Sequence, residues 1–255
     1  MKDLSEQDIC SKYILPAVVN AGWDLQRQIR EQYGFTAGRI TVRGKTVTRG
    51  EQKRVDFILY HRGHLPLAII EAKDNHHSVG DGMQQALGYA EALDVPFVYS
   101  SNGNAFLEHD RLTKAGPIER EFKLNEFPSP DELYNRYIKA KGLAVQQEQV
   151  INQDYYQEID GKSPRYFQQV AVNRATEEIV KGKNRLLLVM ATGTGKTYAA
   201  FQIIWRLWKA GVKKRILFLV DRNILADQPI MNDFRHFGDK MTKVHHRNID
   251  KSYEV

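Results

Sequence analysis

The apolar run Leu186–Met190, which is followed by the residues Ala-Thr-Gly-Thr-Gly-Lys-Thr, constrains this chain more than any other feature. A continuous apolar run of this length predicts a strand that is buried on both faces. The residues Lys196–Lys209 have helical periodicity. Gly193 and Gly195 allow a tight turn between the two elements. This order predicts a loop whose backbone N–H groups surround an anion at the start of the helix.

The side chains of this loop indicate that the anion is the phosphate group of ATP. Lys196 would reach the β and γ phosphates, and the Thr197 hydroxyl would bind Mg²⁺. A strict phosphate-binding loop has a glycine six residues before its lysine, and Met190 occupies that position here. A glycine-rich turn that binds no nucleotide is the alternative. The loop residues predicted to bind ATP are Thr192, Gly193, Thr194, Gly195, Lys196 and Thr197.

The segments around the loop predict a parallel sheet. Arg165–Lys181 has helical spacing, and Arg215–Val220 is a second apolar run downstream of the loop. Strands that are apolar throughout and alternate with helices are typical of parallel sheets that are covered on both faces.

The first half of the chain predicts a mixed α/β unit. The apolar positions of Glu6–Ala21 recur at helical spacing, with a kink at Pro16. Short extended runs separated by glycine turns occupy Trp23–Lys73. A helix is expected at Met83–Leu93, followed by the strand-like segment VPFVYSS and by a helix at Asp131–Lys141.

Two extended runs of the first half, RVDFILY and PLAIIEAK, predict a hairpin. A turn centred between Gly63 and His64 places Asp56 opposite Glu71, and like charges in that arrangement are destabilising. Such a pair needs a cation, and Mg²⁺ prefers hard oxygen ligands. Lys73 is two residues beyond Glu71 and shares its face of the strand. The metal would polarise a phosphoryl oxygen, while Lys73 would orient a water or offset developing charge.

A solvated hairpin in which Lys73 neutralises one acid is the alternative, since an Asp followed by Glu-x-Lys occurs by chance. Gln85 and Tyr89 favour the chemical interpretation, because they are four residues apart on the helix expected after the hairpin. Both could hold a phosphate oxygen or brace the metal ligands. Alternatively, Tyr89 is an aromatic residue that packs on the sheet. Glu6 is a further acid that could lie near the metal.

Composition adds a weak preference for a polyanionic partner, because the net charge is +6. The single cysteine, Cys10, excludes an internal disulfide framework and suits a reducing compartment. The first residues are acidic where a signal peptide would be basic. No apolar run approaches the roughly 18 residues that span a bilayer. A soluble intracellular protein without a membrane partner is expected.

The order D…ExK…QxxxY resembles the nuclease domains of the RecB-like branch of the PD-(D/E)xK superfamily. This resemblance implies that Asp56 and Glu71 are metal ligands and that Lys73 is catalytic. It also implies assisting roles for Gln85 and Tyr89.

The segment ATGTGKT is similar to the phosphate-binding loop of superfamily 2 helicases, whose motor domains have a RecA-like parallel sheet. SPRYFQQ resembles the Q motif of that superfamily, so Gln168 is implied to contact the adenine edge and to select ATP over GTP. ILFLVDRNILADQ resembles helicase motif Ia and implies DNA-binding roles for Arg222 and Gln228.

A nuclease followed by a motor in one chain resembles the N-terminal part of the restriction (R) subunit of type I restriction-modification enzymes. The resemblance implies a site-specific deoxyribonuclease that depends on ATP and Mg²⁺ and acts on double-stranded DNA. It also implies methyltransferase and specificity subunits as partners in a bacterial or archaeal cytoplasm. A repair helicase-nuclease without methyltransferase partners, or a non-cutting ATP-gated DNA-binding subunit, are the alternatives.

The expected domains are a PD-(D/E)xK nuclease domain at residues 1–142 and a RecA-like motor domain at residues 164–255. Residues 143–163 are rich in Gln, Asn and Asp and are expected to form a linker. The motor also needs an Asp-Glu pair on a later strand. No such segment precedes Val255, so the motor is expected to be incomplete.

Overall fold

The computed structural model describes residues 3–36, 41–43, 46–48, 50–62, 64–157, 161, 163–221, 227 and 229–244. The chain divides into two compact units, Met1–Ala144 and Val145–Val255. No helix among the described residues is both long enough and apolar enough to cross a membrane.

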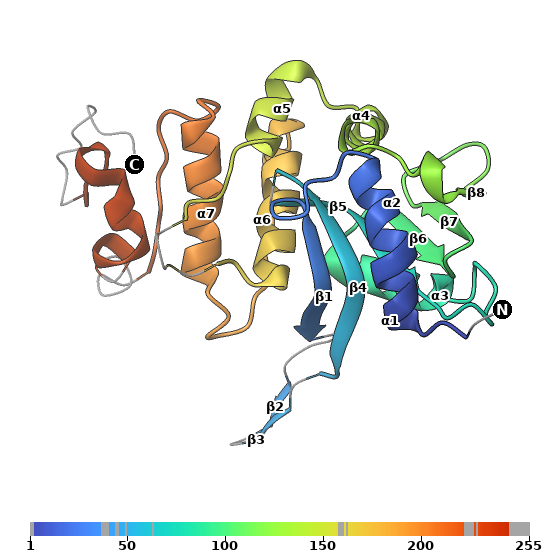
Figure 1. The fold of residues 1–255 in the computed structure, drawn as a ribbon. Helices are drawn as coiled ribbons and strands as arrows, with labels where there is room; N and C mark the ends of the chain where they lie inside the picture. The colour runs from blue at the N-terminus through green and yellow to red at the C-terminus, as the bar shows by residue number, and fades with distance from the viewer. Residues whose placement is uncertain are drawn as a thin grey trace. The chain divides into compact units, whose positions relative to one another are not determined.

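The first unit is built on a six-stranded mixed sheet with the strand order β1-β4-β5-β6-β7-β8 (Figure 1). The pair β5 and β6 is parallel, and the other neighbouring pairs are antiparallel. A mixed α/β fold is therefore confirmed for this unit. The six strands are β1 (Ile29–Thr36), β4 (Gln52–His61), β5 (Leu65–Ala72), β6 (Phe97–Ser101), β7 (Ala105–Asp110) and β8 (Glu119–Lys123). A separate two-stranded ribbon consists of β2 (Thr41–Arg43) and β3 (Thr46–Thr48).

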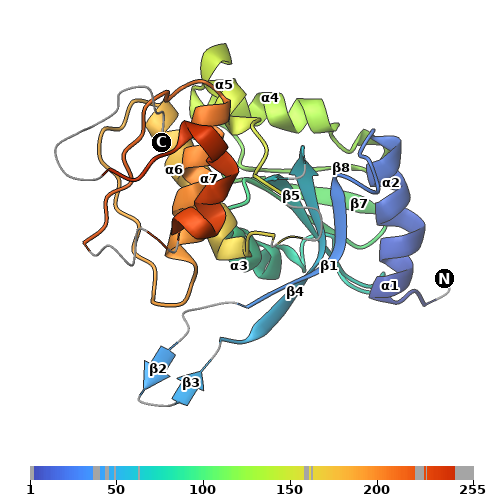
Figure 2. The ribbon, with the colours of Figure 1, turned by 90° about the vertical axis from the view of Figure 1, so that its left-hand side faces the viewer.

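Helices cover both faces of this sheet. The first helical run consists of α1 (Glu6–Ile9), a π-helical turn (Cys10–Ile14) and α2 (Leu15–Asn20). It lies on one face, and α3 (Met83–Leu93) lies on the other, as the two views in Figures 1 and 2 show. α3 is the crossover between the parallel strands β5 and β6, and α4 (Pro130–Lys141) follows β8.

The expected irregularity of the first helix lies just before its proline. The π-helical turn ends at Ile14, and Pro16, which has no N–H to donate, lies in the first turn of α2 directly after it. Gly22, with φ of +98°, follows the end of this helix.

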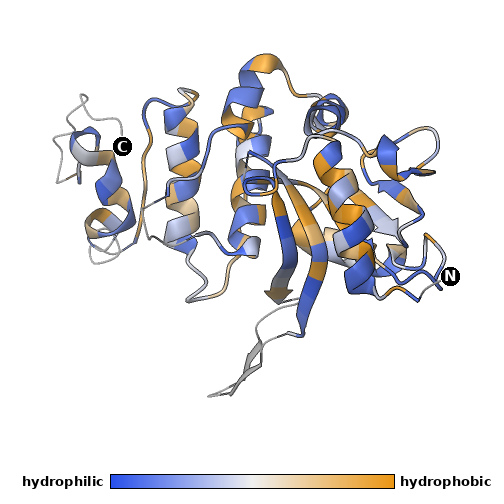
Figure 3. Cartoon of the chain, in the orientation of Figure 1, coloured by the Kyte–Doolittle hydropathy of each residue, from blue (hydrophilic) through white to orange (hydrophobic). Residues whose placement is uncertain are grey.

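Burial along the two central strands explains their positions in the sheet. All eight residues of β5 are buried, which is typical of a strand covered on both faces. β4 is exposed or half-buried at its start and buried from Phe57 onward, and Figure 3 shows the matching change from hydrophilic to hydrophobic residues. The polar half of β4 carries Asp56, next to the point where the core begins.

The hairpin of β4 and β5 has the predicted register at the end that carries the two acids. Phe57 pairs with Ile70. One step further along this register is the predicted pair of Asp56 and Glu71. Beyond a bulge after Leu59 the pairs shift by one residue, so the predicted turn centre between positions 63 and 64 is wrong. The bulge absorbs the shift, and the pairing beside the acids is unaffected.

The second unit consists mainly of helices packed around two apolar clusters. Its helices are α5 (Val145–Ile151), α6 (Tyr166–Val180), α7 (Lys196–Lys209) and a 3₁₀ segment (Asp233–Lys240). Val150 of α5 and Tyr155 are buried in the cluster that α6 and α7 share. The interval 143–163, expected from its composition to be a linker, therefore contains a helix with its own buried contacts. Of the described residues in this interval, only Val150 and Tyr155 enter that cluster, too few residues to produce a helical pattern in the sequence.

The structure contradicts the two buried strands predicted for the second unit. Leu186–Met190 and Arg215–Val220 are not strands, and Leu187 and Val189 are 86% and 87% exposed. An apolar run predicts burial, but a strand also needs neighbours that accept and donate its backbone hydrogen bonds. Among the residues that the structure describes in this unit, none pairs with either segment.

Candidate functional site

The two predicted carboxylates of the hairpin lie at the same end of β4 and β5. Asp56 accepts two hydrogen bonds. Its Oδ2 accepts the Ala72 backbone N–H at 2.8 Å, and its Oδ1 accepts the side-chain amide of Gln32 at 3.0 Å. Ala72 itself is fully buried, as its place between Glu71 and Lys73 predicts. The backbone of β5 therefore fixes the orientation of the acid on β4.

Glu71 is buried, with only 4% of its surface exposed. Its Oε1 accepts a hydrogen bond from the Gln85 amide, whereas its Oε2 is buried and has no hydrogen-bond partner among the described residues. Burial, and next the nearby negative charge of Asp56, raise the pKa of Glu71 to about 8. A buried carboxylate oxygen without a donor calls for a proton or a cation.

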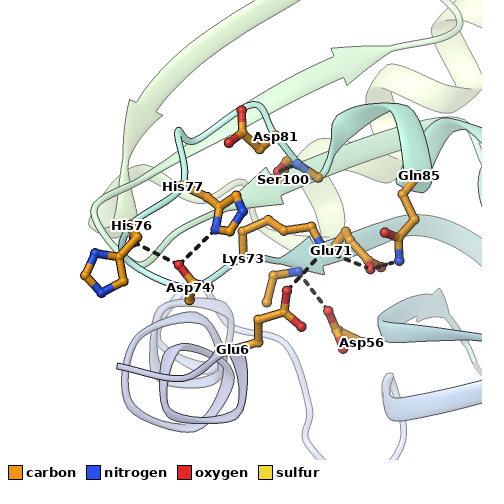
Figure 4. Close-up of polar contacts among 12 residues, drawn as sticks. Glu6, Asp56, Glu71, Lys73, Asp74, His76, His77, Asp81, Gln85 and Ser100 are labelled. Carbon is orange, nitrogen blue, oxygen red and sulfur yellow. Dashed lines mark hydrogen bonds and ion pairs between the residues drawn. The ribbon is translucent and has the colours of Figure 1, made fainter. Parts of the chain in front are cut away.

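Lys73 supplies positive charge to the same place. Its Nζ lies 3.2 Å from Oε1 of Glu6 and 3.8 Å from Oε1 of Glu71. Burial acts to lower the pKa of Lys73, but the hydrogen bond that Lys73 donates to Glu6 and the charges of the surrounding acids outweigh it and raise the pKa. Glu6, Asp56, Glu71 and Lys73 converge in Figure 4, so the further acid expected from the first helix does reach the site.

Gln85 and Tyr89 face the site from α3, on the same side of the helix as predicted. The Gln85 amide donates to the Tyr89 hydroxyl at 2.9 Å as well as to Glu71. Tyr89 is 9% exposed and makes an edge-to-face contact with Phe35 at 5.5 Å between ring centroids. Burial raises the pKa of Tyr89, so it is a neutral hydroxyl at physiological pH. Gln85 therefore links Glu71 to a packed aromatic residue.

These oxygen atoms fit a divalent cation such as Mg²⁺. The unpartnered Oε2 of Glu71 and the carboxylate of Asp56 are hard oxygen donors, as Mg²⁺ requires. Within the described part of the chain, no group of three His, Cys, Asp or Glu side chains has the arrangement of a complete metal site. A cation here would therefore keep several water ligands, which is usual for Mg²⁺.

A cavity of about 710 Å³ opens beside these residues, and Arg54, Gln32 and Asp56 line it together with the first helix. Cys10 also lines this cavity. Burial, followed by the charge of Asp56, raises the pKa of its thiol to about 12, so the thiol is protonated at neutral pH. Sequence reasoning did not identify Gln32, since an isolated glutamine in a strand belongs to no motif.

The glycine loop of the second unit has the expected backbone. Gly193 and Gly195 have φ of +79° and +82°, a region that favours glycine. The loop leads directly into α7, whose first residue is Lys196. The Lys196 ammonium donates to the carbonyl oxygens of Met190 and Ala191 at 3.3 Å each. Thr192 and Thr197 lie in the loop and in the first turn of α7, so the predicted phosphate-binding residues form one continuous segment.

Gln168 contacts this loop. Its amide donates to the Thr194 carbonyl oxygen at 2.8 Å, and its Oε1 accepts the Arg165 backbone N–H at 2.9 Å. A Cβ atom on Gly195 would lie 2.4 Å from the Gln168 amide nitrogen. Both ends of the Gln168 amide are thus bound to protein, although the sequence predicts that they contact adenine. The predicted DNA-binding residues Arg222 and Gln228 lie outside the described residues.

Comparisons with known proteins agree with the order of these two sites. Residues 25–122 match the family model of the type I restriction enzyme R protein N terminus, and residues 161–254 match that of the type III restriction enzyme res subunit. The chain is 52% identical over its whole length to the type I restriction enzyme EcoAI endonuclease subunit of Escherichia coli. The chain belongs to the type I restriction enzyme R subunit family.

Two further R subunits support this assignment. The EcoKI endonuclease subunit of Escherichia coli K12 is 30% identical over 79% of the chain. A solved fragment assigned to the HsdR subunit of a type I restriction enzyme from Vibrio vulnificus YJ016 has a TM-score of 0.81 and 40% identity. The matched region spans the whole of the present chain and 46% of the Vibrio fragment. The chain spans 32% of the EcoAI subunit and 21% of the EcoKI subunit.

Proposed function

We propose that residues 1–142 form a PD-(D/E)xK nuclease domain that cuts DNA with Mg²⁺. The observation that carries this proposal is the buried Oε2 of Glu71, which has no hydrogen-bond partner in the described structure and lies in a carboxylate pair with Asp56. Asp56 and Glu71 would be the metal ligands, and Lys73 would be the catalytic ammonium that orients the attacking water or offsets developing charge. The position of Gln85 and Tyr89 behind Glu71 supports their assisting role.

Each residue of this site has a distinct task in phosphodiester hydrolysis. A bound cation supplies Lewis acidity and a water of lowered pKa. The Ala72 N–H holds Asp56 in place, and Gln85 holds Glu71 in place, so both ligands are oriented before substrate arrives. Lys73 is long enough to leave Glu6 and place its ammonium beside the charge that develops on the phosphate. Glu6 would hold Lys73 in readiness until then.

We also propose that residues 164–255 are the first part of a RecA-like motor that binds ATP, with residues 143–163 connecting it to the nuclease. The two glycines with positive φ and the helix that starts at Lys196 support a phosphate site formed by Thr192, Gly193, Thr194, Gly195, Lys196 and Thr197. Thr197 would bind the Mg²⁺ that accompanies ATP. Gln168 would act on ATP through the loop that it holds.

The whole protein would be a type I site-specific deoxyribonuclease that uses ATP to move along double-stranded DNA. Its partners would be methyltransferase and specificity subunits, and it would work in the cytoplasm of a bacterium or archaeon. Arg222 and Gln228 would contact the DNA. The similarity to two endonuclease subunits of type I restriction enzymes supports this assignment.

Reciprocal substitutions in the full-length protein test the two proposals. Asp56→Ala, Glu71→Ala or Lys73→Ala should abolish cleavage and leave DNA-stimulated ATP hydrolysis largely intact. Lys196→Ala should abolish ATP hydrolysis and, with it, cleavage. Plasmid cleavage and phosphate release are measured side by side on the assembled enzyme. An Asp56→Ala enzyme that cuts at the wild-type rate would refute the nuclease site.

A further inference from the structure

Gln32 has a backbone conformation that is unusual for its position. It lies in the middle of β1, with φ of +50°, in the left-handed region that a side chain other than glycine rarely adopts. The ladder to β4 pairs Glu31 with Phe57 and Tyr33 with Val55, and it skips Gln32. Two other non-glycine residues of the described chain have positive φ, Arg62 at a hairpin turn and Asp94 at the end of α3. Those are ordinary positions for this conformation, whereas the middle of a strand is not.

The strained residue contacts the candidate metal ligand. The Gln32 amide nitrogen donates to Oδ1 of Asp56 at 3.0 Å, and the Ala72 N–H donates to Oδ2 at 2.8 Å. An ionised carboxylate can only accept, so the NH₂ end of the amide must face Asp56. With one donor on each oxygen, the plane of the carboxylate is fixed. Gln32 and Asp56 both line the cavity of about 710 Å³.

We propose that Gln32 is a positioning residue of the nuclease site, which orients Asp56 for the divalent cation. This inference rests on the proposed nuclease function. Strained backbone persists where the surrounding structure enforces it, and it clusters at functional sites. At this position the strain turns the side chain of an edge strand toward the acid of the neighbouring strand. Each oxygen of Asp56 keeps a lone pair for a cation, so the amide preorganises the ligand without occupying it.

Two substitutions separate the role of the amide from the cost of the backbone. Gln32→Ala removes the amide and keeps the strained conformation, whereas Gln32→Gly removes both. Gln26→Ala is the matched control, because Gln26 is an exposed glutamine just before the same strand. Mn²⁺ binding to the nucleotide-free 255-residue chain is measured by electron paramagnetic resonance, and the melting temperature is measured on the same samples.

Both Gln32 variants should bind Mn²⁺ about tenfold more weakly than wild type, at the lower end of the effect of groups that orient metal ligands. Gln32→Gly should nevertheless melt at a higher temperature than Gln32→Ala, because glycine relieves the strain. In the assembled full-length enzyme, cleavage by Gln32→Ala should need about tenfold more Mg²⁺ and recover at saturation. The Gln26→Ala control should change none of these properties.

An Asp56→Ala sample distinguishes the two ways in which the inference can fail. If Asp56→Ala binds Mn²⁺ as well as wild type does, the proposed metal site itself is wrong. If Asp56→Ala loses Mn²⁺ binding while both Gln32 variants bind like wild type, the nuclease site stands and the role of Gln32 is refuted. A purely structural Gln32 would lower the melting temperature without shifting the Mn²⁺ titration.

Discussion

Breaking the buried charge network around Glu108 should strongly destabilise the first unit. Glu108 lies in β7 with a side chain that is 2% exposed. Arg136 of α4 donates to its two carboxylate oxygens at 3.0 and 2.7 Å and also to Asp110 at 2.8 Å. Tyr99 and Arg120 complete the shell around the carboxylate. Arg136→Met therefore leaves a buried carboxylate that has lost its strongest partner.

The expected cost of Arg136→Met is about 3 kcal/mol in the free energy of unfolding. Removing one partner of a buried ion pair costs roughly 3–5 kcal/mol. The lower end applies because Arg120, whose side chain is 51% exposed, still donates to Glu108 at 3.0 Å. The contact of the Arg136 guanidinium with the Phe97 ring, at 4.5 Å, adds about 0.5–1 kcal/mol. In the double variant with Glu108→Gln, part of the loss should be recovered, since the buried side chain at position 108 no longer carries a charge and only Asp110 still lacks its arginine partner.

Urea denaturation followed by tryptophan fluorescence measures this effect. The chain has three tryptophans, so replacing Trp205 and Trp208 with phenylalanine leaves Trp23 as the only reporter. Trp23 is 2% exposed and its indole N–H donates to the Pro128 carbonyl oxygen, just before α4. If Arg136→Met lowers the free energy of unfolding by less than about 1 kcal/mol, the reasoning is refuted, because an exposed ion pair contributes no more than that.

The same network has a defined pH dependence. Burial acts to raise the pKa of Glu108, but the hydrogen bonds from Arg136 and Tyr99 outweigh it and lower the pKa below its ordinary 4.5. A depressed pKa in the folded state gives stability that is fully present above 4.5 and lost as the pH falls below it. The destabilisation by Arg136→Met should therefore shrink on acidification. A cost that stays constant through this range would show that the ionised form of Glu108 is not what Arg136 stabilises.

Three further predictions concern the two candidate sites. Because the pKa of Glu71 is raised from 4.5 to about 8, the metal-free chain should lose stability relative to Glu71→Gln as the pH rises through that range. Curves of unfolding free energy against pH that run parallel for the two proteins would contradict this. Gln168→Ala should weaken ATP and GTP binding alike in nucleotide titrations, because Gln168 holds the loop; a loss confined to ATP would restore the adenine-reading role. Gly195→Ala should weaken ATP binding about tenfold or more, since the new Cβ would displace Gln168 and strain a φ of +82°; unchanged binding would show that the loop adapts.

The proximity of the residues in the first candidate site could be predicted because they are neighbours along the chain or across one hairpin. The register of β4 and β5 follows from the alternation of the two strands, and the bulge lies on the far side of the hairpin from Asp56. The spacing of Gln85 and Tyr89 on a helix likewise specifies a shared face. Gln32 could not be found in this way, because its φ of +50° depends on contacts between strands and has no local signature.

The limits of sequence reasoning are clearest in the second unit. Both helices were predicted closely, since α7 begins and ends at the expected residues Lys196 and Lys209. The apolar runs between them specify a preference for burial but not the neighbours that would provide it, and Leu217 and Leu219 are 74% and 82% exposed. Helices satisfy their backbone hydrogen bonds internally, whereas strands depend on distant segments. The local sequence pattern therefore predicts helices more reliably than strands.

The bond between Trp23 and Pro128 joins segments that are 105 residues apart in the chain. A ribosome adds roughly 5–20 residues per second, so Trp23 would wait on the order of 5–20 s for its partner to be synthesised. During this interval the helix that carries Glu6 has no completed core beneath it. The three acids Glu6, Asp56 and Glu71 all lie within the first 71 residues, yet their arrangement would be completed only once the segment before α4 has been made. Synthesis order would thus delay the assembly of the candidate metal site until the unit around it can close.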